Sequence, residues 1–226
     1  MRYKNIRPAR FLDRPNRFIA HIELDGRTEV CHVKNTGRCR ELLREGATVY
    51  VQECDAAGRK TRFDLIAVEK GELLINMDSQ APNRAFEEWA GQGCFWPDLT
   101  RLSPETRFGS SRFDFYLEAA QRRGFVEVKG VTLERDGTVL FPDAPTARGR
   151  KHVEELISCR SAGYEACLVF IVQMKGPERF LPNEETDPAF AASLRKAAAA
   201  GVQILAWDCH VTADSMSVDQ PLPVIL

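Results

Sequence analysis

The sequence predicts two domains of different fold class: a small OB-like β-barrel over residues 1–80, then a domain with a mixed α/β sheet over residues 81–226. Short strand patterns and turn signals fill the first part. The chain becomes polar and turn-prone at residues 78–82, and beyond this point buried strand patterns alternate with helical ones. A generic β-barrel with no binding role is the alternative for the first part.

The first domain is expected to contain five strands and one short helix. Asp-Gly at 25–26 and Lys-Gly at 70–71 are hairpin turn signals between strand-like segments. The segment 39–46 follows Thr36-Gly37, carries two adjacent leucines and closes with glycine, which predicts one or two helical turns. The expected strands are 18–24, 28–33, 48–53, 63–69 and 72–76.

The second domain is expected to begin with a helix over residues 83–90 that Asn83 caps. An irregular segment with Pro97 and Pro104 follows. Strand patterns over 111–118 and 125–130 are separated by polar and small residues, so the two strands can fold back on each other as a hairpin.

The rest of the second domain alternates strands with helices. Residues 166–173 are nearly all apolar, as in a central parallel strand that is covered on both faces. Thr146 precedes one helical pattern, which ends at Gly163, and Asp187-Pro188 precedes another, which ends at Gly201. Further strands are expected at 131–135, 139–141 and 202–207, and no element is assigned to the tail from residue 208.

Two acids and a lysine are the candidate chemical group of the second domain. Side chains alternate between the faces of a strand, so Glu127 and Lys129 share one face of the strand over 125–130. In the preceding strand, the same alternation places Asp114 opposite the face that Phe113 and Phe115 share. The hairpin would then bring Asp114 close to Glu127 and Lys129.

The spacing of these residues, D-x12-E-x-K, suits a magnesium site. Mg²⁺ takes one or two carboxylates together with water and phosphate oxygens. A bound Mg²⁺ lowers the pKa of its water and offsets charge on a phosphodiester, and Lys129 could orient the attacking water or steady the phosphate. The alternative is that Glu127 and Lys129 form an ordinary ion pair on the surface of a strand.

Charge is distributed unevenly along the chain, although the net charge is −1. Residues 1–62 carry 14 Lys and Arg against 8 Asp and Glu, whereas residues 63–226 carry 17 against 24. Neutralisation of phosphates drives nucleic-acid binding, so a basic first part suits a module that grips a polyanion. Scattered, solvated arginines are the alternative.

Other features exclude several classes of protein. No apolar run reaches the roughly 18 residues of a membrane span, and no apolar stretch follows the basic N-terminus. We therefore expect no signal peptide, no membrane partner and a cytoplasmic location. The seven cysteines form no Cys-x-x-Cys pair, which favours reduced, mostly buried thiols over disulfides or zinc. No Ser/His/Asp triad, P-loop or dinucleotide loop is present in the sequence.

Six stretches carry a resemblance to known proteins: VKNTGRCRELL (33–43), SRFDF (111–115), FVEVKGVTL (125–133), FPDAPTARGRKHVEEL (141–156), DPAF (187–190) and AAAAGVQILAW (197–207). With them, most of the chain resembles the sugar fermentation stimulation (SfsA) family of DNA/RNA nucleases, and the acid and lysine pattern resembles that of the PD-(D/E)xK nuclease superfamily. One departure is Phe113, which stands where the wider superfamily has Pro before the first acid.

This resemblance implies an OB-like domain followed by a restriction-endonuclease-like nuclease domain. Asp114 and Glu127 would hold Mg²⁺, with Mn²⁺ as a substitute, and Lys129 would be the catalytic lysine. The third acid of the superfamily would correspond to Glu87 or Glu88 on the first helix, with Glu105 as a competing candidate, and the sequence does not choose among them.

The resemblance also assigns nucleic-acid contacts to Arg38 and Arg112 and, after Thr146, to three residues of the next helix. Positive side chains oppose the dipole at the start of that helix, so a bound phosphate would relieve a local penalty. An ordinary solvated face is the alternative, and the histidine alone could be a satisfied core or surface residue. The helix residues are Arg148, Lys151 and His152.

Three functions are compatible with the sequence. The first is a Mg²⁺-dependent nuclease acting on DNA, RNA or both. The second is a nucleic-acid-binding regulator of sugar-utilisation genes that does not cleave, although no helix-turn-helix pattern supports it. The third is a carbohydrate-acting enzyme with Asp114 and Glu127 as paired carboxylates. Lys129 disfavours the third, because it would keep Glu127 ionised. Strand preference and mode of cleavage stay open, and so does the oligomeric state, for which a homodimer is one candidate.

Overall fold

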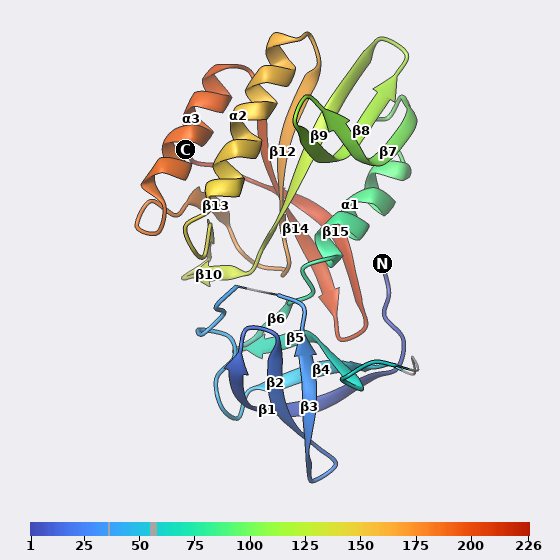
Figure 1. Ribbon diagram of the computed structural model, residues 1–226, viewed down its shortest axis with the longest axis vertical. Helices are drawn as coiled ribbons and strands as arrows, with labels where there is room; N and C mark the ends of the chain where they lie inside the picture. The colour runs from blue at the N-terminus through green and yellow to red at the C-terminus, as the bar shows by residue number, and fades with distance from the viewer. Residues whose placement is uncertain (36, 55–57) are drawn as a thin grey trace.

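The computed structural model describes residues 1–35, 37–54 and 58–226, which form two domains stacked along the long axis of the molecule (Figure 1). A β-barrel lies at one end, and a larger domain with helices on both faces of a sheet lies at the other. Both predicted fold classes are confirmed. None of the described helices is long and apolar enough to cross a membrane.

The barrel is built from a sheet with the strand order β3-β2-β1-β4-β5-β6. A parallel pairing between β3 and β5, with Cys31 opposite Phe63, closes five of these strands into an OB-like barrel. Apolar side chains such as Phe11, Ile22 and Val49 fill its interior. The strands are β1 (Ile6–Asn16), β2 (Ile19–Leu24), β3 (Arg27–Val33), β4 (Thr48–Glu53), β5 (Phe63–Lys70) and β6 (Leu73–Asn76).

Two parts of the barrel differ from the prediction. Strand β1 was not expected, because Phe11 is its single fully buried residue among arginines, prolines and other polar residues. The helix predicted over 39–46 is wrong. Cys39 has a left-handed backbone conformation (φ 45°), and its carbonyl accepts from the amides of both Leu42 and Leu43, which makes an isolated turn. Thr36, which precedes this segment, lies outside the described residues.

The second domain is organised around a six-stranded mixed sheet with the order β15-β14-β12-β9-β8-β7. Strand β12 runs parallel to both β9 and β14, while the remaining pairs are antiparallel. Helices α2 and α3 cover one face of the sheet and α1 covers the other (Figure 1). The elements are α1 (Ala81–Gly91), β7 (Leu99–Phe108), β8 (Ser111–Ala119), β9 (Arg122–Val131), β10 (Leu133–Arg135), β11 (Thr138–Phe141), α2 (Ala147–Ser161), β12 (Glu165–Val172), β13 (Arg179–Pro182), α3 (Pro188–Ala199), β14 (Gln203–Thr212) and β15 (Ser215–Leu222).

Most landmarks of this domain agree with the sequence analysis. Thr146 caps α2 by accepting a hydrogen bond from the Gly149 amide at 3.0 Å, and Asp187 caps α3 by accepting from the Phe190 amide at 2.9 Å. The edge strands β7 and β15 were not expected. Asn83 is not a cap, because α1 begins earlier, at Ala81. The domain boundary at residues 80 and 81 falls between β6 and α1, and it stays a prediction.

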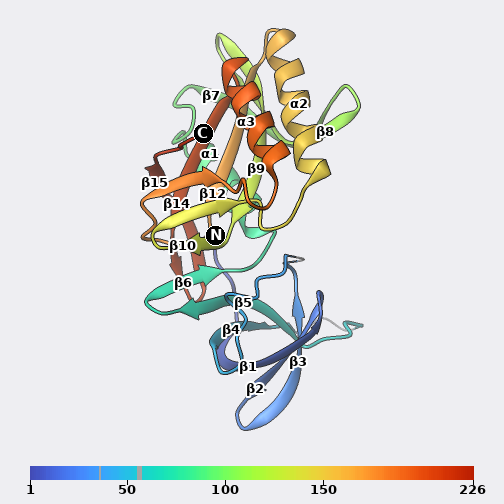
Figure 2. The same cartoon turned by 90° about the vertical axis from the view of Figure 1, so that its left-hand side faces the viewer.

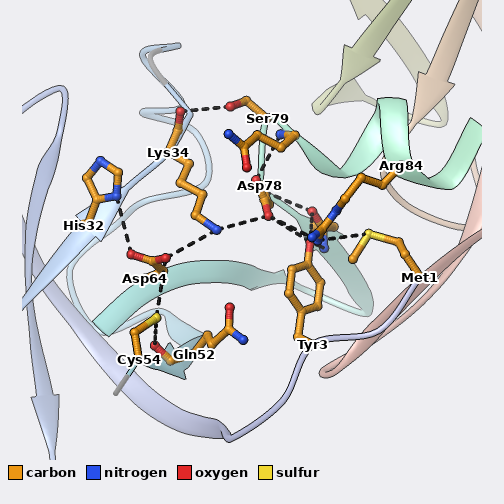
Figure 3. Close-up of polar contacts among 12 residues, drawn as sticks. Met1, Tyr3, His32, Lys34, Gln52, Cys54, Asp64, Asp78, Ser79 and Arg84 are labelled. Atoms are coloured by element: carbon orange, nitrogen blue, oxygen red, sulfur yellow. Dashed lines mark hydrogen bonds and ion pairs between the residues drawn. The ribbon is translucent and has the colours of Figure 1, made fainter. Parts of the chain in front are cut away.

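A cluster of buried polar residues lies where the barrel meets the second domain (Figure 3). We define this junction cluster as Tyr3, Lys34, Asp64, Asn76 and Asp78. Lys34 Nζ lies 3.3 Å from Asp64 Oδ2 and 3.4 Å from Asp78 Oδ2, so it bridges two carboxylates whose residues are 2% and 0% exposed. The Tyr3 hydroxyl donates to Asp78 at 3.3 Å, and burial raises the pKa of Tyr3, which keeps this hydroxyl a donor.

Neighbouring residues complete the bonding of the two aspartates. Arg59 pairs with Asp64, and His32 Nδ1 lies 3.4 Å from the same carboxylate. For Asp78, the Gln80 amide donates to Oδ1 at 2.9 Å and Arg84 lies 3.8 Å from Oδ2. Every oxygen of both buried carboxylates therefore has a partner.

Gln173, directly after β12, ties the barrel to the central sheet. Its side-chain Nε2 donates to the backbone carbonyls of Asn76 at 3.0 Å and Asp78 at 3.1 Å. Its backbone carbonyl accepts from the Asn76 backbone amide at 2.8 Å. Gly130 permits this approach, because a Cβ at that position would lie 2.5 Å from Gln173 Oε1 and 2.7 Å from Cγ of Pro82. The barrel, α1 and β9 therefore meet at one tightly packed point.

Candidate active site

The predicted acid and lysine group lies on β9, in the middle of the second domain. Strand β9 is hydrogen-bonded to β12 on one side and to β8 on the other. Phe125 belongs to the apolar core under α2, whereas Val126 and Val128 belong to the core under α1. The alternation predicted for this strand is confirmed, and Glu127 and Lys129 lie on the α2 side with Phe125.

Glu127 is buried, with 2% of the residue exposed, and its two carboxylate oxygens differ. Oε1 accepts from Lys129 Nζ at 2.5 Å and is also hydrogen-bonded to Nδ1 of His152. Oε2 is equally shielded and has no hydrogen-bond partner among the described residues. Buried polar atoms almost always have a partner, so this oxygen has unused capacity to bind a donor or a cation.

Asp114 reaches the group because β8 separates from β9 at this point. The registered pairing of the two strands ends with Phe115 opposite Val126. Beyond this pair, the Asp114 side chain accepts the backbone hydrogen bond that a carbonyl of β8 would otherwise accept. Its Oδ2 accepts from the Val128 amide at 2.8 Å, and its Oδ1 accepts from Asn83 Nδ2 at 2.8 Å. Asn83 thus connects α1 to the site.

The predicted side-chain alternation of β8 fails at the same place. Phe115 lies in the core under α1, but Phe113 packs in the other core against Phe125, with ring centroids 5.5 Å apart. The two phenylalanines therefore do not share a face. The separation of β8 from β9 removes the regular register on which the alternation depends.

The two carboxylates have opposite pKa shifts. Burial, followed by the negative charge of Glu127, raises the pKa of Asp114. Burial also acts to raise the pKa of Glu127, but the hydrogen bond from His152 and the charge of Lys129 outweigh it, so the net shift is downward. A cation between the two would relieve the repulsion that raises the pKa of Asp114.

His152 is a buried neighbour of Glu127, with 7% of the residue exposed. The Arg148 Nε lies 3.4 Å from His152 Nε2 and can only donate. The Nε2 atom therefore acts as the acceptor, which leaves the ring proton on Nδ1, where it is donated to Glu127. The sequence analysis treated His152 as a phosphate contact, whereas its closest described contact is with the Glu127 carboxylate.

Comparison with known proteins agrees with this architecture. The family model described as "Sugar fermentation stimulation protein RE domain" matches residues 80–215, and the model described as "SfsA N-terminal OB domain" matches residues 12–77. The chain belongs to the SfsA family. Its second domain is accordingly a restriction-endonuclease-like domain.

Curated SfsA relatives cover nearly the whole chain. A sugar fermentation stimulation protein homolog from Desulfitobacterium hafniense is 60% identical over 216 residues, which cover 96% of this chain and 94% of the relative. A homolog from Clostridium beijerinckii is 51% identical over the full length of both chains. The solved structure of Pyrococcus furiosus SfsA in complex with Ca²⁺ superposes with a TM-score of 0.89 at 30% identity, covering 100% of this chain and 98% of that one.

The three candidates for the third acid are not in contact with Asp114 or Glu127 in the described structure. Glu88 lies 2.6 Å from the N-terminal amine of Met1, and Glu105 pairs with Arg112 at 2.7 Å. Glu87 is exposed on α1. The contact from α1 to Asp114 comes instead from Asn83, and the described part of the chain has no group of three or more His, Cys, Asp or Glu side chains placed to hold a metal. The third acid stays a prediction.

The predicted nucleic-acid contacts are not gathered at one place. Arg148 and Lys151 lie on the first turns of α2, beside the site, and Lys151 is 3.8 Å from Glu155. Arg112 is exposed at the start of β8. Arg38 belongs to the barrel, where it lines a basic pocket. All seven cysteines are free, as predicted, and burial raises the pKa of the Cys39 thiol to about 12.

Sequence reasoning missed Asn83 and the inward position of His152. Asn83 was assigned to a cap because Asn is a preferred N-cap residue, although Pro82 before it already belongs to the first turn of α1. His152 shares a helical face with Gly149, Val153 and Leu156, all of which are buried, and this spacing could have shown that it points inward.

Proposed function

We propose that this SfsA protein is a metal-dependent nuclease that hydrolyses phosphodiester bonds of DNA, RNA or both, with Mg²⁺ as its cofactor and Mn²⁺ as a substitute. The observation that carries the proposal is the buried Oε2 of Glu127, beside Asp114 and Lys129, which has no partner among the described residues. A purely structural ion pair has no need of a buried carboxylate oxygen that lacks a partner.

The donor set fits a hard divalent cation. Asp114 and Glu127 supply carboxylate oxygens, which both Mg²⁺ and Ca²⁺ prefer, and Mg²⁺ commonly binds through one or two carboxylates with water and phosphate completing its shell. The relative from Pyrococcus furiosus, described in complex with Ca²⁺, supports a divalent ion in this family. Bound Mg²⁺ would lower the pKa of a coordinated water and offset the charge of the phosphodiester.

The protein residues then have separate tasks. Lys129, whose side chain is 18% exposed, can donate to the phosphate or orient the attacking water. His152 donates from Nδ1 to Glu127 and fixes the orientation of that carboxylate, as partners of metal ligands commonly do. Asn83 and the Val128 amide hold Asp114 in the same way. Arg148 and Lys151 on α2 would contact the substrate phosphates.

The test is cleavage of labelled single- and double-stranded DNA and RNA with Mg²⁺, with Mn²⁺ or with EDTA. We expect the wild type to cleave in Mg²⁺ and Mn²⁺ and to be inactive in EDTA. Lys129→Met should lower the rate by about 100- to 10,000-fold, the usual range for removing a group that assists proton transfer. Glu127→Gln should lower the rate strongly as well, because it removes a metal ligand. Lys196→Met, which removes an exposed lysine of α3, should cleave like the wild type.

Equal activity of wild type and Glu127→Gln would overturn the proposal. A protein that binds one DNA sequence tightly, cleaves nothing in either metal and keeps its binding in Asp114→Ala would be the non-cleaving regulator instead. The four substrates also determine whether DNA or RNA, and paired or unpaired strands, are preferred.

A further inference from the structure

A pocket on the barrel is surrounded by arginines. It has a volume of about 280 Å³ and lies between the β1–β2 turn and the segment that follows β3. This volume is just below the range of pockets that enclose drug-sized ligands, so it suits a small group such as a phosphodiester unit. The pocket is lined by Arg14, Asn16, Arg17, Arg38, Arg40 and Leu43.

Arg14 is built into the floor of this pocket. Its Nη1 donates to the carbonyls of Gly37 and Arg38, both at 2.9 Å, and its Nη2 donates to the carbonyls of Arg17 and Asn35, both at 2.7 Å. The Nε of the same guanidinium is shielded from solvent and has no partner among the described residues. Arg14 therefore fixes the two segments that form the pocket through neutral acceptors, and its own charge is not offset by a carboxylate.

The other three arginines of the pocket have no ion-pair partner among the described residues either. In the part of the chain that the structure describes, no carboxylate lies within ion-pair distance of Arg17, Arg38 or Arg40, and no acidic residue lines the pocket. Elsewhere on the barrel, Arg7 pairs with Asp25 and Arg62 pairs with Glu53. Four arginines without an ion pair in the described residues thus gather around one pocket, as expected of a surface that attracts a polyanion.

An exposed aromatic ring lies beside the pocket. Phe18, in the β1–β2 turn, is 44% exposed, and the Arg17 guanidinium carbon lies 4.7 Å from the centre of its ring. The backbone at this position is held in place, because the Phe18 carbonyl accepts from the Val33 amide at 2.8 Å and the Phe18 amide donates to Asn16 Oδ1 at 2.9 Å. An exposed ring on a fixed turn is a stacking platform rather than part of the core.

We propose that this pocket and Phe18 form a subsite for single-stranded nucleic acid, in which the arginines bind backbone phosphates and Phe18 stacks on an unpaired base. The proposal rests on the proposed function for the class of ligand. Arginine-lined grooves and exposed aromatic rings are the two elements of single-strand binding surfaces, and OB folds commonly use the loop between strands 1 and 2 for this purpose. A duplex hides its base faces, so an exposed ring contributes little to binding one.

The β1–β2 turn and the segment after β3, which line the pocket, lie at the end of the barrel that faces the second domain (Figure 2). Gly37, whose carbonyl binds Arg14, is so close to the Asp143 carboxylate that a Cβ at position 37 would overlap it. Asp143 precedes α2, the helix that carries Arg148 and His152 to the candidate active site. A strand held on the barrel therefore lies next to the segment that leads into the active site.

The experiment is fluorescence anisotropy of the full-length chain in EDTA, which prevents metal-dependent cleavage, with labelled DNA and RNA oligonucleotides of about 16 nucleotides, the upper end of an OB-fold site. Phe18→Ala and Phe18→Leu should bind single strands about 5- to 100-fold more weakly, and Phe18→Trp should bind like the wild type. Val30→Ala is the matched control, because Val30 is equally exposed, at 44%, but has no ring.

A second pair of variants tests the arginines. Arg38→Ala should weaken binding and reduce the slope of log K against log salt by about 1. Arg27→Ala, at the other end of β2, removes the same charge from an exposed position and should leave binding unchanged.

The outcomes separate this inference from the nuclease proposal. Binding that is unaffected by Phe18→Ala, or equal affinity for a blunt duplex, would overturn the subsite even if Mg²⁺-dependent cleavage is observed. Binding that depends on Phe18 in a protein that cleaves nothing would support the subsite and overturn the nuclease. The DNA and RNA arms show which nucleic acid the barrel prefers.

Discussion

Two groups of buried acids occupy the centre of this molecule, one at the domain junction and one at the candidate active site. At the junction, Asp64 and Asp78 share Lys34, and each of their oxygens has a partner. At the candidate active site, Glu127 also pairs with a lysine, yet its Oε2 is buried with no partner in the part of the chain that the structure describes. Both groups combine two carboxylates with a lysine, and they differ in this one unbonded oxygen atom.

This difference separates a cluster whose bonds are all made from one that can still bind a ligand. Buried charges are tolerated when all their bonds are made, and a fully bonded cluster has no remaining capacity for a ligand. The pair of Asp114 and Glu127 keeps such capacity. Its cost is that burial and the charge of Glu127 disfavour the ionised form of Asp114 and raise its pKa. Removing a charge from the junction cluster should therefore lower the stability of the fold. Removing a charge from the candidate active site should instead weaken metal binding without such a loss of stability.

The largest effect on stability is expected from Lys34→Met. It would leave two buried carboxylates without their shared cation, and breaking a buried pair costs about 3 kcal/mol even at the low end of the usual range. Arg59 and Arg84 remain as partners, so the low end applies. Urea unfolding measures the change, with the exposed Lys4→Met as control. A loss of stability no larger than that of the control would show that the junction cluster does not stabilise the fold.

A slightly smaller effect is expected from Mg²⁺ on the wild type. Binding to the folded state alone raises the free energy of unfolding by about 2.7 kcal/mol at a concentration of 100 Kd. Thermal unfolding in Mg²⁺ and in NaCl of equal ionic strength measures it. Glu127→Gln should lose this stabilisation, whereas Lys34→Met should retain it. Stabilisation that survives in Glu127→Gln would place the metal elsewhere.

Asp187→Asn is expected to cost about 1 kcal/mol at neutral pH. Asp187 is another fully bonded acid: burial acts to raise its pKa, but the amides of Thr146 and Phe190 and the charge of Arg150 lower it. A lowered folded pKa contributes stability above the ordinary Asp range, and this contribution is lost as the pH falls through the folded value. The difference from wild type should therefore vanish in acid, as seen in urea unfolding at several pH values.

Glu23→Gln serves as the control for Asp187→Asn, because Glu23 is exposed and has no ion-pair partner among the described residues. The stability of this control should differ from that of the wild type by close to zero at every pH. A difference for Asp187→Asn that persists unchanged in acid would show that the loss comes from packing rather than charge.

The smallest effect, and the one with the opposite sign, is expected from Asp114→Asn in EDTA. A raised folded pKa means that the ionised form is disfavoured in the folded protein, so the penalty is present above that pKa and disappears as the pH falls through it. Asp114→Asn should therefore gain up to about 1 kcal/mol of stability at neutral pH and nothing in acid. A loss at neutral pH would mean that Asp114 is a structural acid like Asp64 and Asp78.

The sequence predicts the elements that depend on local pattern. The apolar run of β12, the alternation of Glu127 and Lys129 on β9, and the caps Thr146 and Asp187 all follow from side-chain spacing. The edge strands β7 and β15 carry prolines and polar residues, because one side of an edge strand has no neighbour, so their pattern is weak.

The remaining features depend on contacts between distant parts of the chain. Asn83 reaches Asp114 across 31 positions, and Lys34 reaches Asp78 across 44. Whether an oxygen is left without a partner depends on every neighbour at once, and no spacing rule encodes it. The two clusters therefore look alike in the sequence and differ only in the folded protein.

The tight contact of Gly130 with Gln173 and Pro82 has a consequence for how a nucleic acid would be handled. Gly130 directly follows Lys129 and packs against Gln173, which binds Asn76 at the end of β6, so the barrel is attached close to Lys129. The two domains would then keep a fixed distance between the surface of the barrel and the candidate active site, rather than move about a hinge. Products cut from a strand held on the barrel should share one length, counted in nucleotides from the point at which it is held.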